Sequence, residues 1–288
     1  MKTKTYGLQN ETRQYLRRLY SYGRELAGTD IADIDDFVKG LKQLGLWQYL
    51  VDAWLFSSFQ NTGTGSNVVS FLNNKNNTTL VNSPTWNTEG ILVTANNQYI
   101  GLNSAPITFG FPFSIMTVYR ILSNTATTTS DSFRLFGYPN NEVNSGYYYL
   151  ANTSGAGRDV NIGGYGGFMI GTNGGNYSTW KNRNEFHIIG QSFESLTPNG
   201  GAGQSILNNA LFDAITSTGT TNSFSRTSNV YIPSSPARIF YGHGNATVNA
   251  RTMNSIFLFR SGIKFVSMSL IRKLMIKTIL KNQSVIIS

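Results

Sequence analysis

Acidic side chains and histidines are the groups most able to do chemistry in this sequence, and they are sparse between residues 56 and 260. A glycoside hydrolase uses two closely placed carboxylates, one as the acid and the other as the base or nucleophile. The two acids nearest to each other in this stretch, Glu185 and Glu194, stand nine residues apart. No strand therefore carries an alternating acid pair aimed into one cleft. We expect no catalytic residue and no enzymatic activity, while a meeting of acids from separate strands stays open.

Metal and cofactor chemistry has little support in the sequence. The chain has no cysteine, and its two histidines, His187 and His243, lack the spaced partners that would complete a metal site. The glycine-rich stretches 155–157 and 163–167 do not open a helix after a strand, so they match neither a phosphate-binding loop nor a dinucleotide fingerprint. We expect no cofactor and no metal ion, although asparagine and backbone oxygens leave weak calcium binding open.

Aromatic residues beside loops rich in glycine and asparagine are the one feature with binding potential. An exposed ring offers an apolar face and asparagine side chains supply hydrogen bonds, a mixture that suits sugars. Strand alternation leaves the other interpretation open, in which such rings fill the core. We predict a glycan-binding site at Tyr165, Trp180, Tyr147 and Tyr149.

The first 55 residues have a helical pattern. Apolar residues recur there at steps of three or four, which places them on one face of a helix. This stripe is wider than a short free helix exposes to water, so we expect it to dock a partner and the chain to form a homo-oligomer. Residues 1–55 are thus predicted to be an N-terminal helical docking segment. The predicted docking residues are Phe37, Leu41, Leu44, Trp47, Val51 and Trp54.

Residues 56–260 have the pattern of many short strands. Apolar or alternating runs are separated, at intervals of roughly 8–12 residues, by asparagine, glycine, serine and threonine. No helical pattern lies between these runs, and a parallel α/β sheet would need one. The pattern predicts a mainly β fold, a sandwich or a barrel. A helix follows over residues 267–281, so residues 56–288 are predicted to be a β domain closed by a C-terminal helix.

The formal charge of +9 is concentrated at the C-terminal end of the sequence. A basic helix can contact nucleic acid or an acidic protein surface, but a solvated helix face is the commoner case and no RNA-binding signature accompanies it. We expect no nucleic-acid partner. No apolar run approaches the roughly 20 residues that span a membrane, and the first residues lack the apolar core of a secretory signal. The basic residues are Lys264, Arg272, Lys273, Lys277 and Lys281.

Several segments resemble known domains. TLVNSPTW, EGILV, NQYIGL and FSIMTVY resemble the opening of laminin-G-like, concanavalin A-like jelly-roll domains, and SIFLFRSG before a helix resembles their closing strand. The segment DFVKGLKQLGLW resembles the helical lead-in of tailed-phage virion proteins that carry such a jelly roll. In order, these segments are residues 79–86, 89–93, 97–102, 113–119, 255–262 and 36–47.

The resemblance implies an antiparallel jelly-roll sandwich in a non-enzymatic phage virion structural protein, as a head fibre, decoration or tail-appendage component. It implies location in the virion, with other virion proteins and host-surface glycans as partners. The sequence departs from the pattern where the terminal helix opens at Ser267 without acids, and the aspartate-rich calcium and catalytic positions have no counterparts. A carbohydrate-binding module and a glycoside hydrolase of the same fold are the alternatives.

Overall fold

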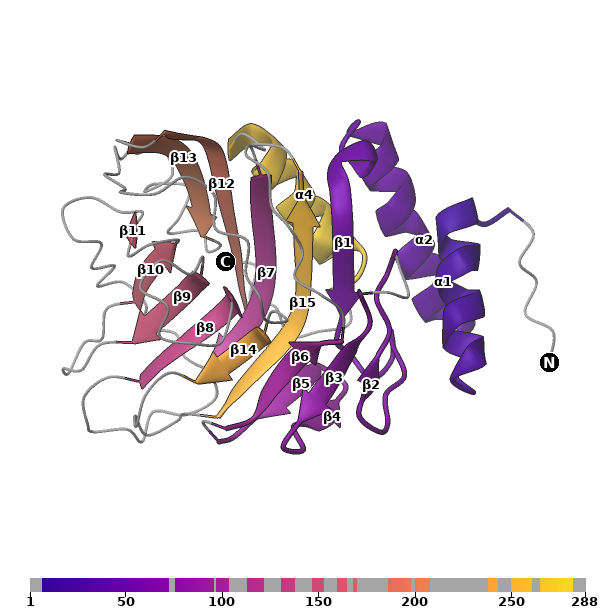
Figure 1. The fold of residues 1–288 in the computed structure, drawn as a ribbon. Coiled ribbons are helices and arrows are strands. Elements are labelled where there is room, and N and C mark those ends of the chain that lie inside the picture. Colours follow the sequence, from indigo (N-terminus) through magenta and orange to yellow (C-terminus); the bar gives the residue numbers. More distant parts are fainter. Residues whose placement is uncertain are drawn as a thin grey trace.

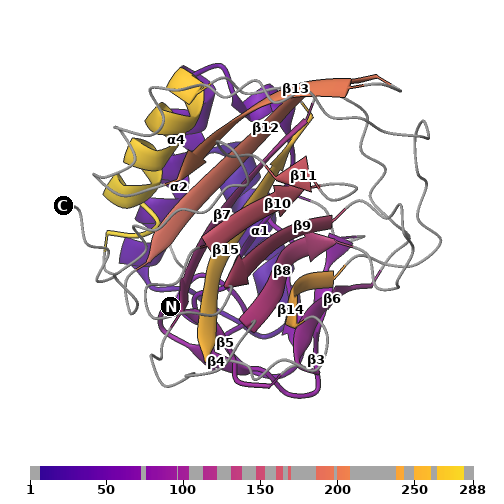
Figure 2. The same ribbon diagram turned by 90° about the vertical axis from the view of Figure 1, so that its left-hand side faces the viewer.

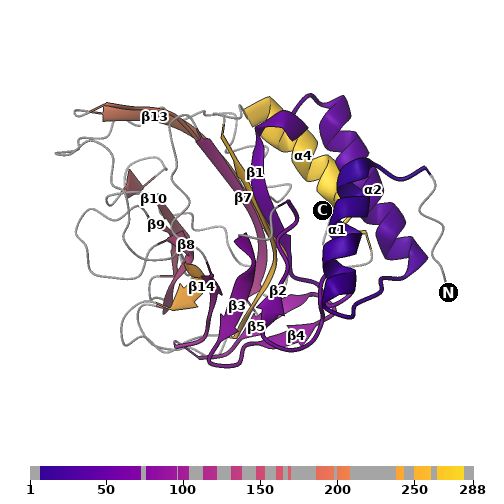
Figure 3. The same ribbon diagram turned by 45° about the vertical axis from the view of Figure 1, so that its right-hand side comes forward.

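The computed structural model describes residues 7–72, 76–95, 97–103, 113–121, 131–137, 147–152, 160–164, 168–169, 186–197, 200–207, 238–242, 250–260 and 265–281. The described residues form three layers: a layer of helices, a sheet that the helices cover, and a second sheet on the far side of the first (Figure 3). Strand pairing is antiparallel throughout both described sheets. The predicted mainly β sandwich is confirmed.

The first sheet, called sheet A, has the strand order β13-β12-β7-β15-β5-β4, with β1 also paired to β15. Along one of its edges, strand β15 pairs with two different strands: residues 251–253 pair with β5, and residues 255–259 pair with β1. We call this division the fork of sheet A. The strands are β1 (Leu50–Leu55), β4 (Thr85–Asn87), β5 (Gly90–Val93), β7 (Phe113–Ile121), β12 (His187–Thr197), β13 (Gly200–Leu207) and β15 (Arg251–Phe259).

The second sheet, called sheet B, has the strand order β11-β10-β9-β8-β14-β6-β3-β2. Viewed as in Figure 2, sheet B lies in front of sheet A, on the side away from the helices. Its strands are β2 (Asn67–Val68), β3 (Thr78–Val81), β6 (Tyr99–Leu102), β8 (Asp131–Gly137), β9 (Tyr147–Asn152), β10 (Val160–Gly164), β11 (Phe168–Met169) and β14 (Arg238–Gly242).

Helices from both ends of the sequence cover the outer face of sheet A (Figure 1). They are α1 (Asn10–Ser21), α2 (Gly28–Gln43), the short 3₁₀ helix η1 (Trp47–Tyr49) and α4 (Phe265–Lys277). Helix α1 turns Tyr15, Leu16 and Leu19 inward, the spacing of one buried helix face. These side chains join α2, α4 and sheet A in one apolar core, in which the Phe37 ring lies 5.2 Å from the Phe257 ring.

The helix predicted through the Phe37–Trp54 stripe is too long. Helix α2 ends at Gln43, where the amide of Gly45 donates to the Lys42 carbonyl at 2.9 Å and the amide of Leu46 donates to the Leu41 carbonyl at 2.9 Å. This pair of hydrogen bonds is the Schellman motif, and Gly45 adopts the φ of +69° that the motif requires. After η1 the chain enters β1, so Val51 and Trp54 belong to a strand of sheet A.

The C-terminal helix was predicted over residues 267–281 and is observed as α4, over Phe265–Lys277, followed by turns to Lys281. Ile271, Met275 and Ile279, which recur at steps of four, are buried in the helix-covered core. In the described ranges no helix is both long and apolar enough to cross a membrane. The division at residue 55 stays a prediction, although β1 places residues 50–55 in sheet A.

Candidate functional site

A row of directly paired residues crosses the outer face of sheet B. Residues directly opposite each other on antiparallel strands share a face. The sequence neighbours Ile100, Ile239 and Leu80 point the other way and are buried, at 0%, 0% and 6% exposure. The row therefore lies on the face that is turned away from the core. We call it the outer row, and it consists of Tyr147 of β9, Gly137 of β8, Arg238 of β14, Gly101 of β6, Thr79 of β3 and Asn67 of β2.

The centre of the outer row is a stacked pair of side chains. Arg238 is paired with Gly137 on one side and with Gly101 on the other, so neither neighbouring strand places a side chain directly beside it. A Cβ atom at Gly101 would lie 3.3 Å from Cε2 of Tyr99 and 3.6 Å from Cγ2 of Val81. The Tyr99 ring thus lies close over the backbone of Gly101, and Cζ of Arg238 stands 4.2 Å from its ring centroid, a cation–π distance.

The rest of the row supplies polar groups of the kind that bind sugar hydroxyls. Thr79 is half-buried and its hydroxyl donates to the side-chain oxygen of Asn103, while Asn67 is exposed. Together with the phenol ring of Tyr99, these groups combine an apolar ring with hydroxyl and amide partners on one sheet face. Such a mixture fixes the orientation of a small polar ligand through a few placed hydrogen bonds.

The structure describes two of the four predicted glycan-binding residues. Tyr165 and Trp180 lie outside the described residues. Tyr147 and Tyr149 are on β9, where Tyr147 is paired with Gly137 and is thus a member of the outer row. Tyr149 is two residues further along and is paired with Arg134 and Gly163. The prediction that these four residues bind a glycan stays a prediction.

Sequence reasoning missed Arg238, Tyr99 and their position beside Tyr147. One signal was available, since a glycine inside a strand often marks a site where another group comes close to the backbone. The runs 99–102 and 132–136 are predicted as strands from the sequence, and Gly101 lies within the first while Gly137 directly follows the second. The pairing that brings them to either side of Arg238 depends on strands more than 100 residues apart in the chain, which no local pattern contains.

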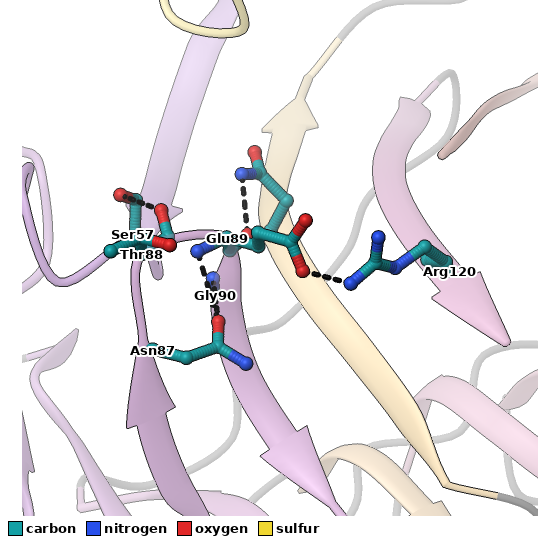
Figure 4. A network of polar contacts seen from close by, with 7 residues as sticks. Ser57, Asn87, Thr88, Glu89, Gly90 and Arg120 are labelled. Atoms are coloured by element: carbon teal, nitrogen blue, oxygen red, sulfur yellow. Dashed lines mark hydrogen bonds and ion pairs between the residues drawn. The ribbon is translucent and has the colours of Figure 1, made fainter. Parts of the chain in front are cut away.

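A polar network closes the fork of sheet A (Figure 4). The side-chain oxygen of Asn87 accepts hydrogen bonds from the amides of Glu89, at 2.9 Å, and Gly90, at 2.7 Å, in the β4–β5 turn. The side-chain amide of Asn254 donates to the Glu89 carbonyl at 2.8 Å. The Glu89 carboxylate forms an ion pair with Arg120 of β7, whose side chain is 13% exposed. The ion pair thus joins the β4–β5 turn to β7, and the hydrogen bond from Asn254 joins the same turn to β15.

Gly90 is required in this network. It has a φ of +150°, and a Cβ atom there would lie 2.0 Å from the carbonyl oxygen of Met253. The turn that carries Glu89 therefore approaches β15 more closely than any residue with a side chain allows. Since the network joins neighbouring strands and its polar groups bind one another, we interpret it as structural.

Asp52 of β1 is a second buried acid with a structural environment. Its carboxylate accepts hydrogen bonds from Ser70 Oγ, from Asn76 Nδ2 and from the amides of Ala53 and Leu72, at 2.8 and 3.2 Å for the two amides. Burial raises the pKa of Asp52 to about 6, and the hydrogen bonds from Ser70 and Asn76 oppose that rise. The carboxylate fastens the segment around residue 70 to sheet A.

Titratable groups do not gather into a metal site within the part of the chain that the structure describes. His243 lies outside those residues, as do Glu142, Asp159, Glu185 and Asp213. The absence of catalysis, metal and cofactor thus remains an expectation from the sequence.

Half of the predicted docking stripe is used inside the chain. Phe37, Leu41 and Trp54 are 0–1% exposed, and Phe37 and Leu41 pack in the core between the helices and sheet A. The prediction that these three residues dock a partner is therefore wrong, because other parts of the same chain cover their side chains. Leu44, Trp47 and Val51 are half-buried, and their role in docking stays a prediction.

Comparison with known proteins identifies the fold. No protein-family model matches the sequence, and no curated protein matches it significantly. Among solved structures, the chain is similar to the Trypanosoma rangeli sialidase in complex with 2,3-difluorosialic acid, with a TM-score of 0.51 and 10% identity over 86% of this chain and 39% of that one. It is also similar to the botulinum neurotoxin serotype D binding domain, with a TM-score of 0.51 and 10% identity over 80% of this chain and 52% of that one.

Both likenesses concern the fold alone, because identity is so low. The chain spans 39% and 52% of the lengths of these two structures, so it corresponds to a part of each. What is common to all of them is a β-sandwich, and the sandwich fold predicted from the sequence thus agrees with solved relatives in shape.

Proposed function

We propose that the chain is a non-enzymatic glycan-binding module, and that the outer face of sheet B is its binding surface. The observation that carries this proposal is the outer row, which brings glycines, an aromatic ring, a guanidinium, a hydroxyl and an amide together on one sheet face. Gly137 and Gly101 add no side chains of their own at the centre of the face. The Tyr99 ring and the neighbouring polar groups supply stacking and hydrogen bonds.

The similar structures support this proposal without deciding it. One is a sialidase in complex with a sugar derivative and the other is the binding domain of a toxin. A sandwich of this shape therefore occurs in proteins that engage ligands. The predicted glycan residue Tyr147 adds support from the sequence, because its register position lies next to Gly137 in the outer row.

The test is binding of the purified chain to an immobilised array of neutral and acidic oligosaccharides. We expect selective binding, weakened about tenfold by Tyr147→Ala through the loss of ring contact with sugar. Tyr49→Ala is the matched control, because Tyr49 is an exposed tyrosine on the helix side of the molecule. Failure of the wild-type chain to bind any oligosaccharide would reject the proposal, as would equal effects of the two substitutions.

We further propose that the module is a structural component of a tailed-phage particle, as a head fibre, decoration or tail appendage. The sequence resemblance supports this setting, and so does the arrangement of layers, since the helices lie on the side of sheet A away from sheet B (Figure 3). Such a molecule can attach through one side and display the other. Half-buried Leu44, Trp47 and Val51 are the remaining candidates for contact with virion proteins or further copies of the chain.

Mass spectrometry of purified particles tests the virion setting. The chain should be present at a constant copy number per particle after stringent purification. Its absence from particles that remain infectious would reject a structural role in the virion, while leaving the glycan proposal untouched.

A further inference from the structure

We propose that Arg238 binds the carboxylate or sulfate group of an acidic saccharide, so that the module selects acidic over neutral glycans. This inference rests on the proposed function, since it names the class of glycan that the outer row would bind. It is carried by the environment of the Arg238 guanidinium, which is half-buried and stacked on the Tyr99 ring at the centre of the outer row.

Three other arginines of the described structure bind groups of the chain itself. Arg24 donates to the Ser58 carbonyl at 2.8 Å, Arg260 donates to the Gln48 carbonyl at 3.0 Å, and Arg120 is paired with Glu89. Each of these side chains holds one segment of the backbone or one carboxylate in place. The guanidinium N–H groups of these three arginines thus have a structural role.

Arg238 has a different environment. Within the ranges that the structure describes, its guanidinium stacks on Tyr99 and has no carboxylate partner or hydrogen-bond acceptor. The side chain is half-buried, so water or a ligand reaches it. A guanidinium carries five N–H donors in a planar fork that matches a carboxylate or a sulfate, and a ring face leaves all of them available.

The surroundings hold the guanidinium ready for such a ligand. Stacking on Tyr99 limits the rotamers of Arg238, so less side-chain entropy is lost when an anion binds. On one side along the row the Tyr99 ring lies over Gly101, and on the other side Gly137 carries no side chain that would lie beside the guanidinium. No member of the outer row is acidic and Arg238 is its one charged member, so the local charge on this row favours an anion.

Neighbouring groups would contact the neutral part of the saccharide. Thr79 lies on the other side of Gly101 from Arg238, and its hydroxyl donates a hydrogen bond to the side chain of Asn103, which directly follows β6. An acidic saccharide would therefore place its charge on Arg238 and its hydroxyls toward Thr79. A lone anion would gain only the first of these contacts, so we expect weak binding of inorganic sulfate.

The experiment compares four probes on the intact chain: 3′-sialyllactose, its methyl ester, 3′-sulfolactose and lactose. The first two differ at one carboxylate, whose negative charge the added methyl group of the ester removes, and the third tests whether sulfate replaces the carboxylate. We expect the charged probes to bind about ten to a hundred times more tightly than the ester and lactose, as charge-assisted hydrogen bonds allow. Added salt should weaken the binding of the charged probes most.

Arg238→Gln should remove this preference while leaving the weaker binding of lactose in place. Arg17→Gln is the matched control, because Arg17 is an exposed arginine on α1 and the substitution changes the charge equally. Circular dichroism and thermal unfolding check that both variants are folded. Arg238→Lys should recover part of the preference, since it restores charge without the planar fork.

The outcomes separate this inference from the proposed function. Equal binding of 3′-sialyllactose and its methyl ester, or a preference that survives Arg238→Gln, would overturn the role of Arg238 while glycan binding stands. A wild-type chain that binds none of the four probes and no other saccharide overturns both.

Discussion

The two outer faces of the sandwich are built from different residues. The outer face of sheet A is covered by α1, α2 and α4, and its side chains, such as Phe257 and Phe259, are buried under them. The outer face of sheet B has tyrosine, glycine, arginine, threonine and asparagine at the positions of the outer row. The comparison shows that the two faces differ in what they can bind. The apolar face of sheet A is buried under helices, whereas the more polar face of sheet B is the one we propose for a ligand.

Truncation of a core ring on the helix-covered side should give the largest effect. Phe37→Ala leaves a cavity between α2 and sheet A, so we expect the free energy of unfolding to fall by about 3–5 kcal/mol. Chemical denaturation followed by circular dichroism measures it. A loss below about 1 kcal/mol would mean that the helices are only loosely attached to the sheet, and the contrast between the two faces would fail.

The buried acid of sheet A should make stability depend on pH. The pKa of Asp52 is about 6 in the folded chain and 3.8 as its ordinary value, so the folded state holds this proton more tightly. The raised pKa therefore adds to the free energy of unfolding below about pH 4. This contribution, about 3 kcal/mol, is lost as the pH rises through about 6. Unfolding measured from pH 4 to 7 checks the expectation.

Asp52→Asn provides the control for that pH profile. The variant cannot titrate at this position, so the difference between wild type and variant isolates Asp52 from the other acids. We expect the wild type to lose stability relative to the variant as the pH rises. Parallel profiles for the two proteins would show that the carboxylate does not titrate in this range.

The smallest effect on folding is expected on the outer face of sheet B. Tyr99→Ala removes a half-buried ring that packs on Gly101 and stacks with Arg238, so we expect a loss of about 1 kcal/mol or less in the free energy of unfolding. Unfolding measured side by side for Tyr99→Ala and Phe37→Ala compares the two losses in the free energy of unfolding. A loss as large as that of Phe37→Ala would make the outer row part of the core, against the proposed binding role.

Local patterns predicted much of the fold. Short apolar and alternating runs marked most of the strands between residues 68 and 259, although β4 and β10 were not among those predicted, and the C-terminal helix was predicted close to its observed place. The prediction failed between residues 44 and 54, where apolar residues keep a helical spacing by coincidence. Gly45 ends α2 there, and pairing of β1 with β15 decides the structure of the residues that follow. Tertiary pairing outweighs local spacing in such a segment.

The candidate site was less predictable than the fold. Composition pointed to tyrosines beside glycine-rich loops, and one of them, Tyr147, occupies a register position in the outer row. Arg238 and Tyr99 could not be found in that way, because they meet through the pairing of β14 with β6, which joins residues 137 positions apart. Register between distant strands is set by the whole sheet, and a sequence without its partners does not reveal it.

The fork of sheet A has a consequence for the order in which the molecule is made. Strand β15 joins β1, β5 and β7, and all three precede it by 130 residues or more in translation. A nascent chain emerging from the ribosome thus holds three unsatisfied strand edges until residue 259 is released. During that interval the edges can recruit neighbouring nascent chains, so slow synthesis or a shortage of chaperones should appear first as aggregation of newly made protein.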